Sequence, residues 1–110
     1  MVSDGEPADR LLKQGPIIDP EHLLTVRAIK MYADGALGSR GAALLEKYSD
    51  YDGKGVFIFL EEETRPRLIK ALNKGIQIGT HAIGDHGNRE GLTCSRWRKC
   101  AFCKINSNGI

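Results

Sequence analysis

Two short apolar runs, each leading into a glycine-rich turn, constrain the fold of this 110-residue chain more than any other feature. The first lies in the string IKMYADGALGSRGAA of residues 29–43 and contains Lys30, and the second lies in THAIGD of residues 80–85 and contains His81. Each places a potential metal ligand in a strand-like run that is followed by a loop. This arrangement is typical of β/α barrels, whose sites lie at the carboxyl ends of the strands.

Length limits this interpretation, because an eight-stranded β/α barrel needs about 250 residues. The barrel interpretation therefore predicts that the chain is a fragment. With 41% hydrophobic and 27% charged residues, the composition is that of a globular protein. The first ten residues are acidic and polar, and nowhere do 18 apolar residues run together, so we expect no signal peptide, no membrane contact and a cytoplasmic location.

Charge divides the chain sharply near its end. Residues 1–92 hold 12 of the 16 basic residues and all 14 acidic ones, whereas residues 93–110 hold four basic residues and no acidic one. All three cysteines and the one tryptophan also follow residue 92. We therefore expect two regions, 1–92 and an unrelated, basic, cysteine-containing tail, 93–110, which is irregular or disordered and has the composition that a shifted reading frame produces.

The order of elements favours an α/β fold. Residues 24–33 have the β-branched and apolar content of a strand, with Val26, Ala28 and Lys30 on one face and Ile29 and Met31 on the other. Residues 1–24 are expected to be a lead-in dominated by turns, and residues 34–55 a long loop with one helical turn at 42–47.

A helix and a second strand are expected further along the chain. A short apolar run, 56–60, is followed by a helix in which Thr64 serves as N-cap, Pro66 lies in the first turn and Gly75 ends the helix. Its apolar face is predicted to contain Leu68, Ile69 and Leu72, and Glu61, Glu62 and Glu63 are typical of an acidic first turn. Residues 76–81 then form a strand, which predicts parallel pairing.

The strings DGALGSR and THAIGD, with their spacing over residues 15–92, resemble the amidohydrolase superfamily, in particular its family 3 branch of metal-dependent hydrolases. The resemblance implies part of a TIM (β/α)₈ barrel, about two β/α units, that hydrolyses amide or cyclic amide carbon–nitrogen bonds. It also implies one or two divalent ions, expected to be zinc. In such proteins the lysine matching Lys30 is commonly carboxylated and bridges the metals, and the histidine matching His81 binds the second metal.

The resemblance also shows what the sequence lacks. The family draws other ligands from a His-x-His pair and from a further histidine and aspartate, but the histidines here are His22, His81 and His86 only. The pattern departs from the family at His86 and Gly87, and it stops beyond Gly91. We therefore expect an isolated chain without activity, an unoccupied metal site, and a need for the remaining barrel strands.

Each candidate residue also has an alternative, structural interpretation. Lys30 is also explained by a lysine that extends to solvent from a strand end, and His81 by a hydrogen-bonded histidine under the turn at Gly84. Asp34 and Asp85 suit turn or cap roles as well as the orientation of a ligand. Two residues are candidate substrate contacts of the glycine-rich loop, Ser39 and Arg40, and His86 is expected to face solvent.

Two alternative functions remain open from the sequence. The tail suits a small zinc- or nucleic-acid-binding module, since it contains Cys94, Cys100 and Cys103 together with basic and aromatic residues between 96 and 104. Nucleic acid is, however, a less expected partner than a small amide-type substrate. The second alternative is a chain with no function of its own, because two parallel strands cannot close a barrel.

Overall fold

The computed structural model describes residues 1–93, which contain two compact units. The first combines Met1–Met31 with Glu62–Thr80, and the second combines Tyr32–Glu61 with the residues from His81 onward. The cysteines and the basic and aromatic side chains of the 93–110 tail lie outside the described residues, so the tail interpretation and the zinc or nucleic-acid alternative stay predictions.

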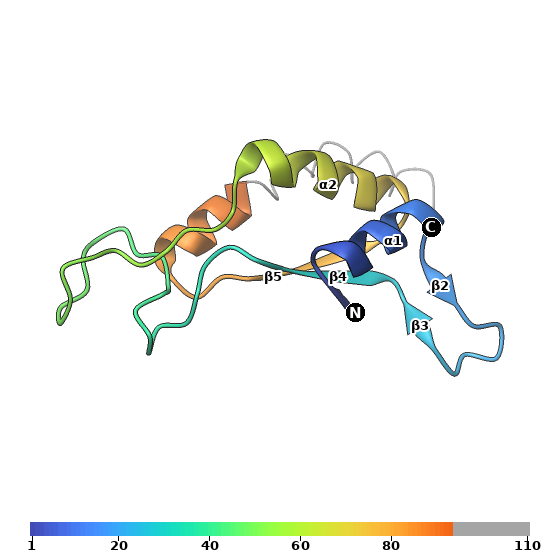
Figure 1. Ribbon diagram of the computed structural model, residues 1–110, viewed down its shortest axis with the longest axis horizontal. Coiled ribbons are helices and arrows are strands. Elements are labelled where there is room, and N and C mark those ends of the chain that lie inside the picture. Colours follow the sequence, from blue (N-terminus) through green and yellow to red (C-terminus); the bar gives the residue numbers. More distant parts are fainter. Residues whose placement is uncertain (94–110) are drawn as a thin grey trace. The chain divides into compact units, whose positions relative to one another are not determined.

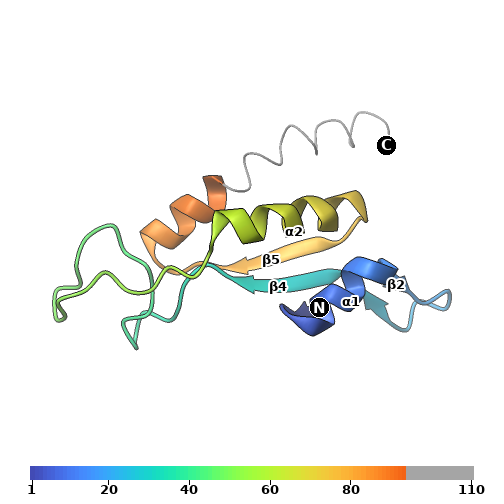
Figure 2. The same cartoon turned by 45° about the horizontal axis from the view of Figure 1, so that its top comes forward.

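A three-stranded sheet forms the centre of the first unit, in the order β1 (Val2–Ser3), β4 (Ala28–Tyr32) and β5 (Gln77–His81). β1 and β4 are parallel, with Val2 opposite Ile29. The arrows of β4 and β5 also point the same way (Figure 2), and the amide of Gln77 donates to the carbonyl of Arg27 at 2.8 Å. The expected α/β class with parallel strands in one sheet is therefore confirmed, and the barrel itself stays a proposal.

β4 shows the predicted alternation. Ile29 and Met31 are 2% and 5% exposed, whereas Ala28 and Lys30 on the other face are half-buried. The expected single strand over 24–33 is wrong, however. Residues Thr25–Val26 form β3, which pairs antiparallel with β2 (Ile17–Ile18) in a separate two-stranded sheet. The chain changes its pairing partner at Arg27, which the apolar content of the run does not reveal.

The lead-in contains a helix that the sequence analysis missed, α1 (Glu6–Gln14). Its buried residues are Ala8, Leu11 and Leu12, spaced three and four apart as one helical face requires. Gly15 ends the helix with φ of 87°, and its amide donates to the carbonyl of Leu11 at 2.8 Å. The turn pairs around this segment obscured a regular amphipathic pattern.

The predicted second helix exists but begins earlier than expected. α2 spans Glu61–Asn73, so the glutamates occupy its first turn as predicted, and Thr64 is buried inside the helix rather than capping it. The early start places Pro66 inside the helix. The buried face consists of Thr64, Leu68 and Ala71, and Ile69, which was expected on that face, is 48% exposed. Gly75 follows the helix with φ of 71°, as a helix-ending glycine should.

Polar contacts join the two helices of the first unit, α1 and α2, which are labelled in Figure 1. Arg67 on α2 pairs with Asp4 and, through Nη1, with Asp9 of α1 at 3.1 Å, and Lys74 Nζ donates to the carbonyl of Lys13 at 2.7 Å. Such partly exposed ion pairs contribute at most about 1 kcal/mol each. Burial of the apolar residues of α1, β4 and α2 therefore contributes more to the stability of this unit.

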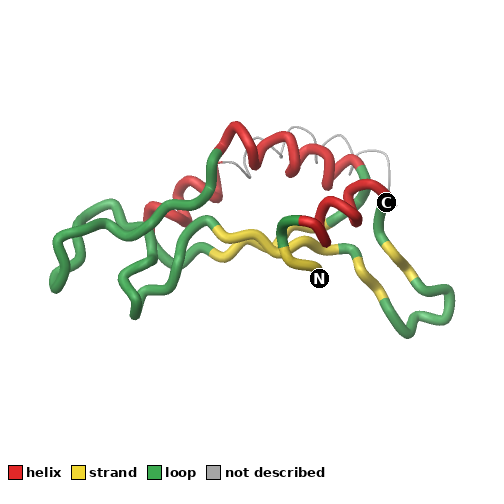
Figure 3. Tube along the Cα trace, viewed as in Figure 1, coloured by secondary structure: helices red, strands yellow, loops and turns green. Residues whose placement is uncertain are grey.

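The second unit consists mainly of a loop over residues 33–60, which has no helix or ladder strand (Figure 3). Its only bridge among the described residues joins Asp34 to Phe57. The helical turn expected at 42–47 is wrong, because the amide of Leu44 donates across the loop to Lys54 at 2.8 Å instead of within a turn. Residues 85–93 are helical and complete the described part of this unit.

None of the helices within residues 1–93 combines the length and the apolar character that crossing a membrane requires.

Candidate metal-ligand residues and the buried carboxylate

Lys30 occupies the middle of β4, in the first unit. Its backbone carbonyl accepts a hydrogen bond from the amide of Asp4 at 3.1 Å, which continues the parallel pairing of Ser3 with Lys30. The side chain is half-buried and lies on the face opposite Ile29 and Met31. The strand thus fixes the backbone of Lys30 through its pairing with β1.

His81 is the last residue of β5 and belongs to the second unit, where 27% of its side chain is exposed. Its Nε2 lies 3.4 Å from the carbonyl oxygen of Gly35, and its ring tilts against Tyr32 with centroids 5.4 Å apart. The backbone carbonyl of His81 accepts from the amide of Ala33 at 2.8 Å. The imidazole is therefore held at the strand end by both its ring and its backbone.

Asp34 is the most constrained polar side chain in this region, with 0% of its surface exposed. Three backbone amides donate to its carboxylate: Ala43 at 2.9 Å and Gly84 at 2.7 Å to Oδ2, and Ile83 at 3.0 Å to Oδ1. These partners come from distant positions in the sequence. A single carboxylate thus ties the start of the loop both to residue 43 and to the turn at 83–84.

The electrostatics of Asp34 follow from these contacts. Burial raises the pKa of the carboxyl, because it disfavours the charged form, but hydrogen bonds from Ile83, Gly84 and Ala43 together outweigh burial and leave the pKa below its ordinary value of 3.8. The nearby His81 adds a smaller effect in the same direction, with Nε2 3.9 Å from Oδ1. Asp34 is thus an ionised carboxylate beside the imidazole.

Close backbone approaches explain the glycines next to these contacts. A Cβ at Gly84 would lie 1.8 Å from the carbonyl oxygen of Ala43, and one at Gly87 would lie 2.5 Å from Oδ2 of Asp34. The same Ala43 carbonyl accepts from the amides of His86 and Gly87 at 3.1 and 3.2 Å. Only glycine leaves room for this packing.

Asp85 makes a second link between the loop and the helical segment 85–93. Its Oδ1 accepts from the amide of Leu45 at 2.9 Å and from the amide of His86 at 2.8 Å, and the residue is exposed. Both aspartates of the two motifs therefore bind backbone amides of the loop. These contacts match the turn and cap roles considered for them.

Ser39 and Arg40 lie in an exposed turn, 37–40. Ser39 Oγ donates to the carbonyl of Ala36 at 3.3 Å, and Arg40 pairs with Asp50 at 2.8 Å, which lowers the pKa of Asp50 below its ordinary value. Arg40 also lies over the ring of Tyr51 at 5.7 Å. Both residues bind within the loop itself, and their role as substrate contacts stays a prediction.

A metal site needs more donors than these residues supply. Within residues 1–93, no group of three His, Cys, Asp or Glu side chains is arranged to hold a metal ion. Asp34 is the acidic neighbour of His81, but its carboxylate already accepts three amides. Zinc sites need three or four protein donors, so the described residues do not by themselves fit a metal.

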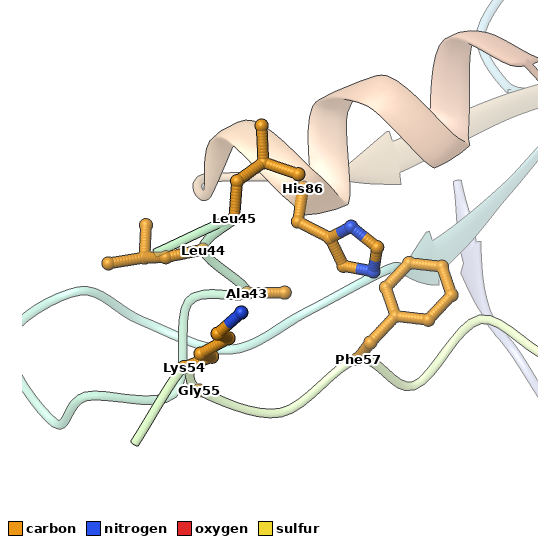
Figure 4. A pocket seen from close by; sticks show the side chains of 7 residues that line it. All are labelled: Ala43, Leu44, Leu45, Lys54, Gly55, Phe57 and His86. Carbon is orange, nitrogen blue, oxygen red and sulfur yellow. The ribbon is translucent and has the colours of Figure 1, made fainter. Parts of the chain in front are cut away.

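An open pocket of about 410 Å³ in the second unit was not expected from the sequence. His86, which was expected to face solvent, is half-buried in its wall, with its ring edge-on to Phe57 at a centroid distance of 5.0 Å. Figure 4 shows His86, Phe57 and Lys54 around this space. No local pattern could pair residues 57 and 86, because the loop brings them together.

Comparison with known proteins places these motifs in context. The sequence profile of a family described as "Amidohydrolase family" matches residues 4–93. The chain is 48% identical over 59 residues to the putative amidohydrolase YtcJ of Bacillus subtilis (strain 168), covering 53% of this chain and 11% of that protein. It is 31% identical over 81 residues to the protein LONG AFTER FAR-RED 3 of Arabidopsis thaliana, covering 73% of this chain and 14% of that protein.

Two solved structures are also similar, and both are described as uncharacterized metal-dependent hydrolases. The one from Pyrococcus horikoshii OT3 has a TM-score of 0.73 at 32% identity and covers 81% of this chain and 19% of that chain. The one from Pyrococcus furiosus has a TM-score of 0.75 at 28% identity and covers 86% and 20%. The chain therefore spans between 11% and 20% of the lengths of these four proteins.

Proposed function

This chain belongs to the amidohydrolase family, and we propose that it supplies about two β/α units to a metal-dependent hydrolase with a TIM (β/α)₈ barrel. The resemblance inferred from the sequence motifs is confirmed, and the match over residues 4–93 is the observation that carries the proposal. The similarity to two metal-dependent hydrolases and the parallel strands of the sheet support it.

The proposed reaction is hydrolysis of an amide or cyclic amide carbon–nitrogen bond in a small-molecule substrate. A divalent metal, with zinc as the proposed ion and one or two ions in the complete enzyme, would lower the pKa of a bound water and so supply the nucleophile. The family membership and the name of the Bacillus subtilis relative support this chemistry. A cytoplasmic location belongs to the same proposal.

We assign the metal-ligand roles to Lys30, as a carboxylated lysine, and to His81. Support for His81 comes from its position at the carboxyl end of β5 and from the Gly35 carbonyl 3.4 Å from Nε2. A histidine that donates one ring N–H to a backbone carbonyl keeps the lone pair of its other nitrogen for a metal. Asp34, Asp85, Ser39 and Arg40 are proposed to hold and shape the surrounding loop.

The chain alone is expected to be inactive. Two ligands bind a metal weakly and without fixed geometry, and the donor set has to be completed by the remaining barrel strands. Those strands are therefore the proposed structural partners, with a small amide-type molecule as substrate. No nucleic-acid or membrane partner is part of the proposal.

The test begins with the coding sequence on both sides of this chain. If it encodes a His-x-His strand and the further histidine and aspartate ligands, the longer product is purified with zinc and assayed against N-acyl amino acids and cyclic amides. We expect hydrolysis that Lys30→Ala and His81→Ala each reduce at least 100-fold, a loss on the scale of ~3 kcal/mol in transition-state stabilisation. The matched control, Lys47→Ala, alters an exposed loop lysine and should retain activity.

Two results would contradict the proposal. Flanking sequence that encodes no further barrel strands would contradict the proposal that this chain is part of a (β/α)₈ barrel. A longer, folded and zinc-loaded product in which Lys30→Ala and His81→Ala leave zinc content and hydrolysis unchanged would remove the ligand roles.

A further inference from the structure

The open pocket of the second unit is formed by three segments of the chain. Its lining residues are Ala43, Leu44, Leu45, Lys54, Gly55, Phe57 and His86 (Figure 4). None of them belongs to the proposed metal ligands. With about 410 Å³, the pocket lies within the range of small-molecule sites, about 300–1,000 Å³.

Backbone contacts hold the walls of this pocket in place. The amide of Leu44 donates to the carbonyl of Lys54 at 2.8 Å, and the amide of His86 donates to Ala43 at 3.1 Å. A Cβ at Gly55 would lie 1.9 Å from the carbonyl oxygen of Ala42, which shows how closely the two sides of the loop approach. The lining therefore does not depend on side-chain packing alone.

Two polar groups of the lining, on Lys54 and His86, differ from other charged groups of the loop in their contacts. Within residues 1–93, neither the Lys54 ammonium nor the His86 ring makes an ion pair or a side-chain hydrogen bond. By contrast, Lys47 pairs with Asp52 and Arg40 pairs with Asp50. Among the described residues that line the pocket, none is acidic. A cation and a ring N–H thus remain available beside apolar walls.

We propose that this pocket binds a small carboxylate that carries an aromatic or branched aliphatic group. Lys54 and His86 would donate to the carboxylate oxygens, since both groups are hydrogen-bond donors and one is cationic. Leu44, Leu45 and Phe57 would contact the apolar group. This proposal does not rest on the metal-ligand roles of Lys30 and His81.

The test uses the full chain, labelled with ¹⁵N and titrated at neutral pH with benzoate and, separately, with its neutral analogue benzamide. Benzoate is expected to shift the amide signals of Leu44, Leu45 and Gly55 saturably, with a dissociation constant on the order of millimolar. Lys54→Met should weaken benzoate binding about tenfold, since a hydrogen bond to a charged group is lost. Lys54→Arg should retain most of the affinity, and Lys47→Met, the matched control outside the pocket, should retain all of it.

Each remaining outcome counts against the pocket. Equal affinity for benzamide, equal affinity in Lys54→Met, shifts that do not saturate, or shifts confined to other residues would each overturn it. Should Lys54→Met lose the folded spectrum, Lys54→Arg decides: a folded Lys54→Arg chain without benzoate binding overturns the proposal. The titration contains no added metal, so its failure leaves the hydrolase proposal untouched.

Discussion

The two units differ in what holds them together. In the first, apolar side chains of α1, β4 and α2 are buried, among them Leu11, Ile29 and Leu68. In the second, a loop without regular elements is tied by hydrogen bonds from backbone amides to two carboxylates, Asp34 and Asp85. The first unit depends mainly on non-directional burial, whereas in the second unit directional contacts to a few atoms act alongside the burial of Ala33, Ala42, Ala43 and Phe59.

Removing the carboxylate of Asp34 should have the largest effect. Asp34→Ala leaves three amides without their acceptor, and we expect it to lower the free energy of unfolding of the second unit by about 4 kcal/mol, since each buried unsatisfied donor costs about 1–3 kcal/mol. Hydrogen exchange at the amides of Ala43, Ile83 and Gly84 measures the loss. Asp34→Asn keeps one acceptor oxygen, so its free energy of unfolding should lie between those of the unchanged chain and of Asp34→Ala. Unchanged protection in Asp34→Ala would contradict the assigned role.

A core truncation should destabilise the first unit to a slightly smaller extent. Ile29 is 2% exposed on β4. We expect Ile29→Ala to lower the free energy of unfolding by about 3 kcal/mol, because apolar burial is lost and a cavity is left behind. Circular dichroism during urea unfolding gives the change in free energy. The matched control is Ile69→Ala, because Ile69 is 48% exposed and its truncation should change stability little. Equal losses at both positions would show that burial does not dominate this unit.

Glycine substitutions should separate the units more finely. Gly84→Ala would push a methyl group to 1.8 Å from the Ala43 carbonyl oxygen, and we expect a loss of about 2 kcal/mol. Among the described residues, a Cβ at Gly79 in β5 meets only the Met1 side chain, at 3.7 Å, so Gly79→Ala should change stability by less than about 0.5 kcal/mol. Thermal melts of both variants make the comparison. Equal melting temperatures would mean that the loop backbone shifts to admit the methyl group with little loss of stability.

Acid should weaken the second unit in a predictable direction. The folded pKa of Asp34 lies below its ordinary value of 3.8, so its ionised form stabilises the fold fully above that value, and this contribution is lost as pH falls through the folded pKa. Amide protection at Ala43 and Gly84, followed from about pH 6 to pH 3, should decline accordingly. Asp34→Asn should flatten the decline, because it cannot titrate. A decline of equal size in that variant would assign it to other groups.

Regular elements with clear periodicity could be predicted from the sequence, and elements with competing signals could not. The strand 76–81 and the alternation of Ile29 and Met31 followed from a period of two, and the observed strands agree. α1 was missed although Leu11 and Leu12 follow Ala8 by three and four residues, a helical spacing, because glycine and proline flank the segment. The N-cap assigned to Thr64 was wrong because the preceding glutamates already form the first turn of α2.

The surroundings of the candidate site were less accessible to sequence reasoning. The motifs identified His81 and Asp34, but the three amides that bind Asp34 lie 9 to 50 positions away along the chain. The same holds for the pocket, where Phe57 meets His86 across the loop. Hydrogen bonds from distant backbone amides to one carboxylate leave no periodic trace in the sequence, since any residue except proline supplies the donor.

That last property sets how freely the region around Asp34 can diverge between relatives. An anchor that recognises only main-chain N–H groups is indifferent to the side chains beside it, so an exposed position such as Ile83 can exchange among many residue types while the loop keeps its path. Ala43, in contrast, is 2% exposed and has to stay small. Proline is the one exchange that would delete a donor outright. Among relatives we therefore expect exposed side chains of many types around an unchanged loop path, with Asp34 and the close-packed Gly84 retained.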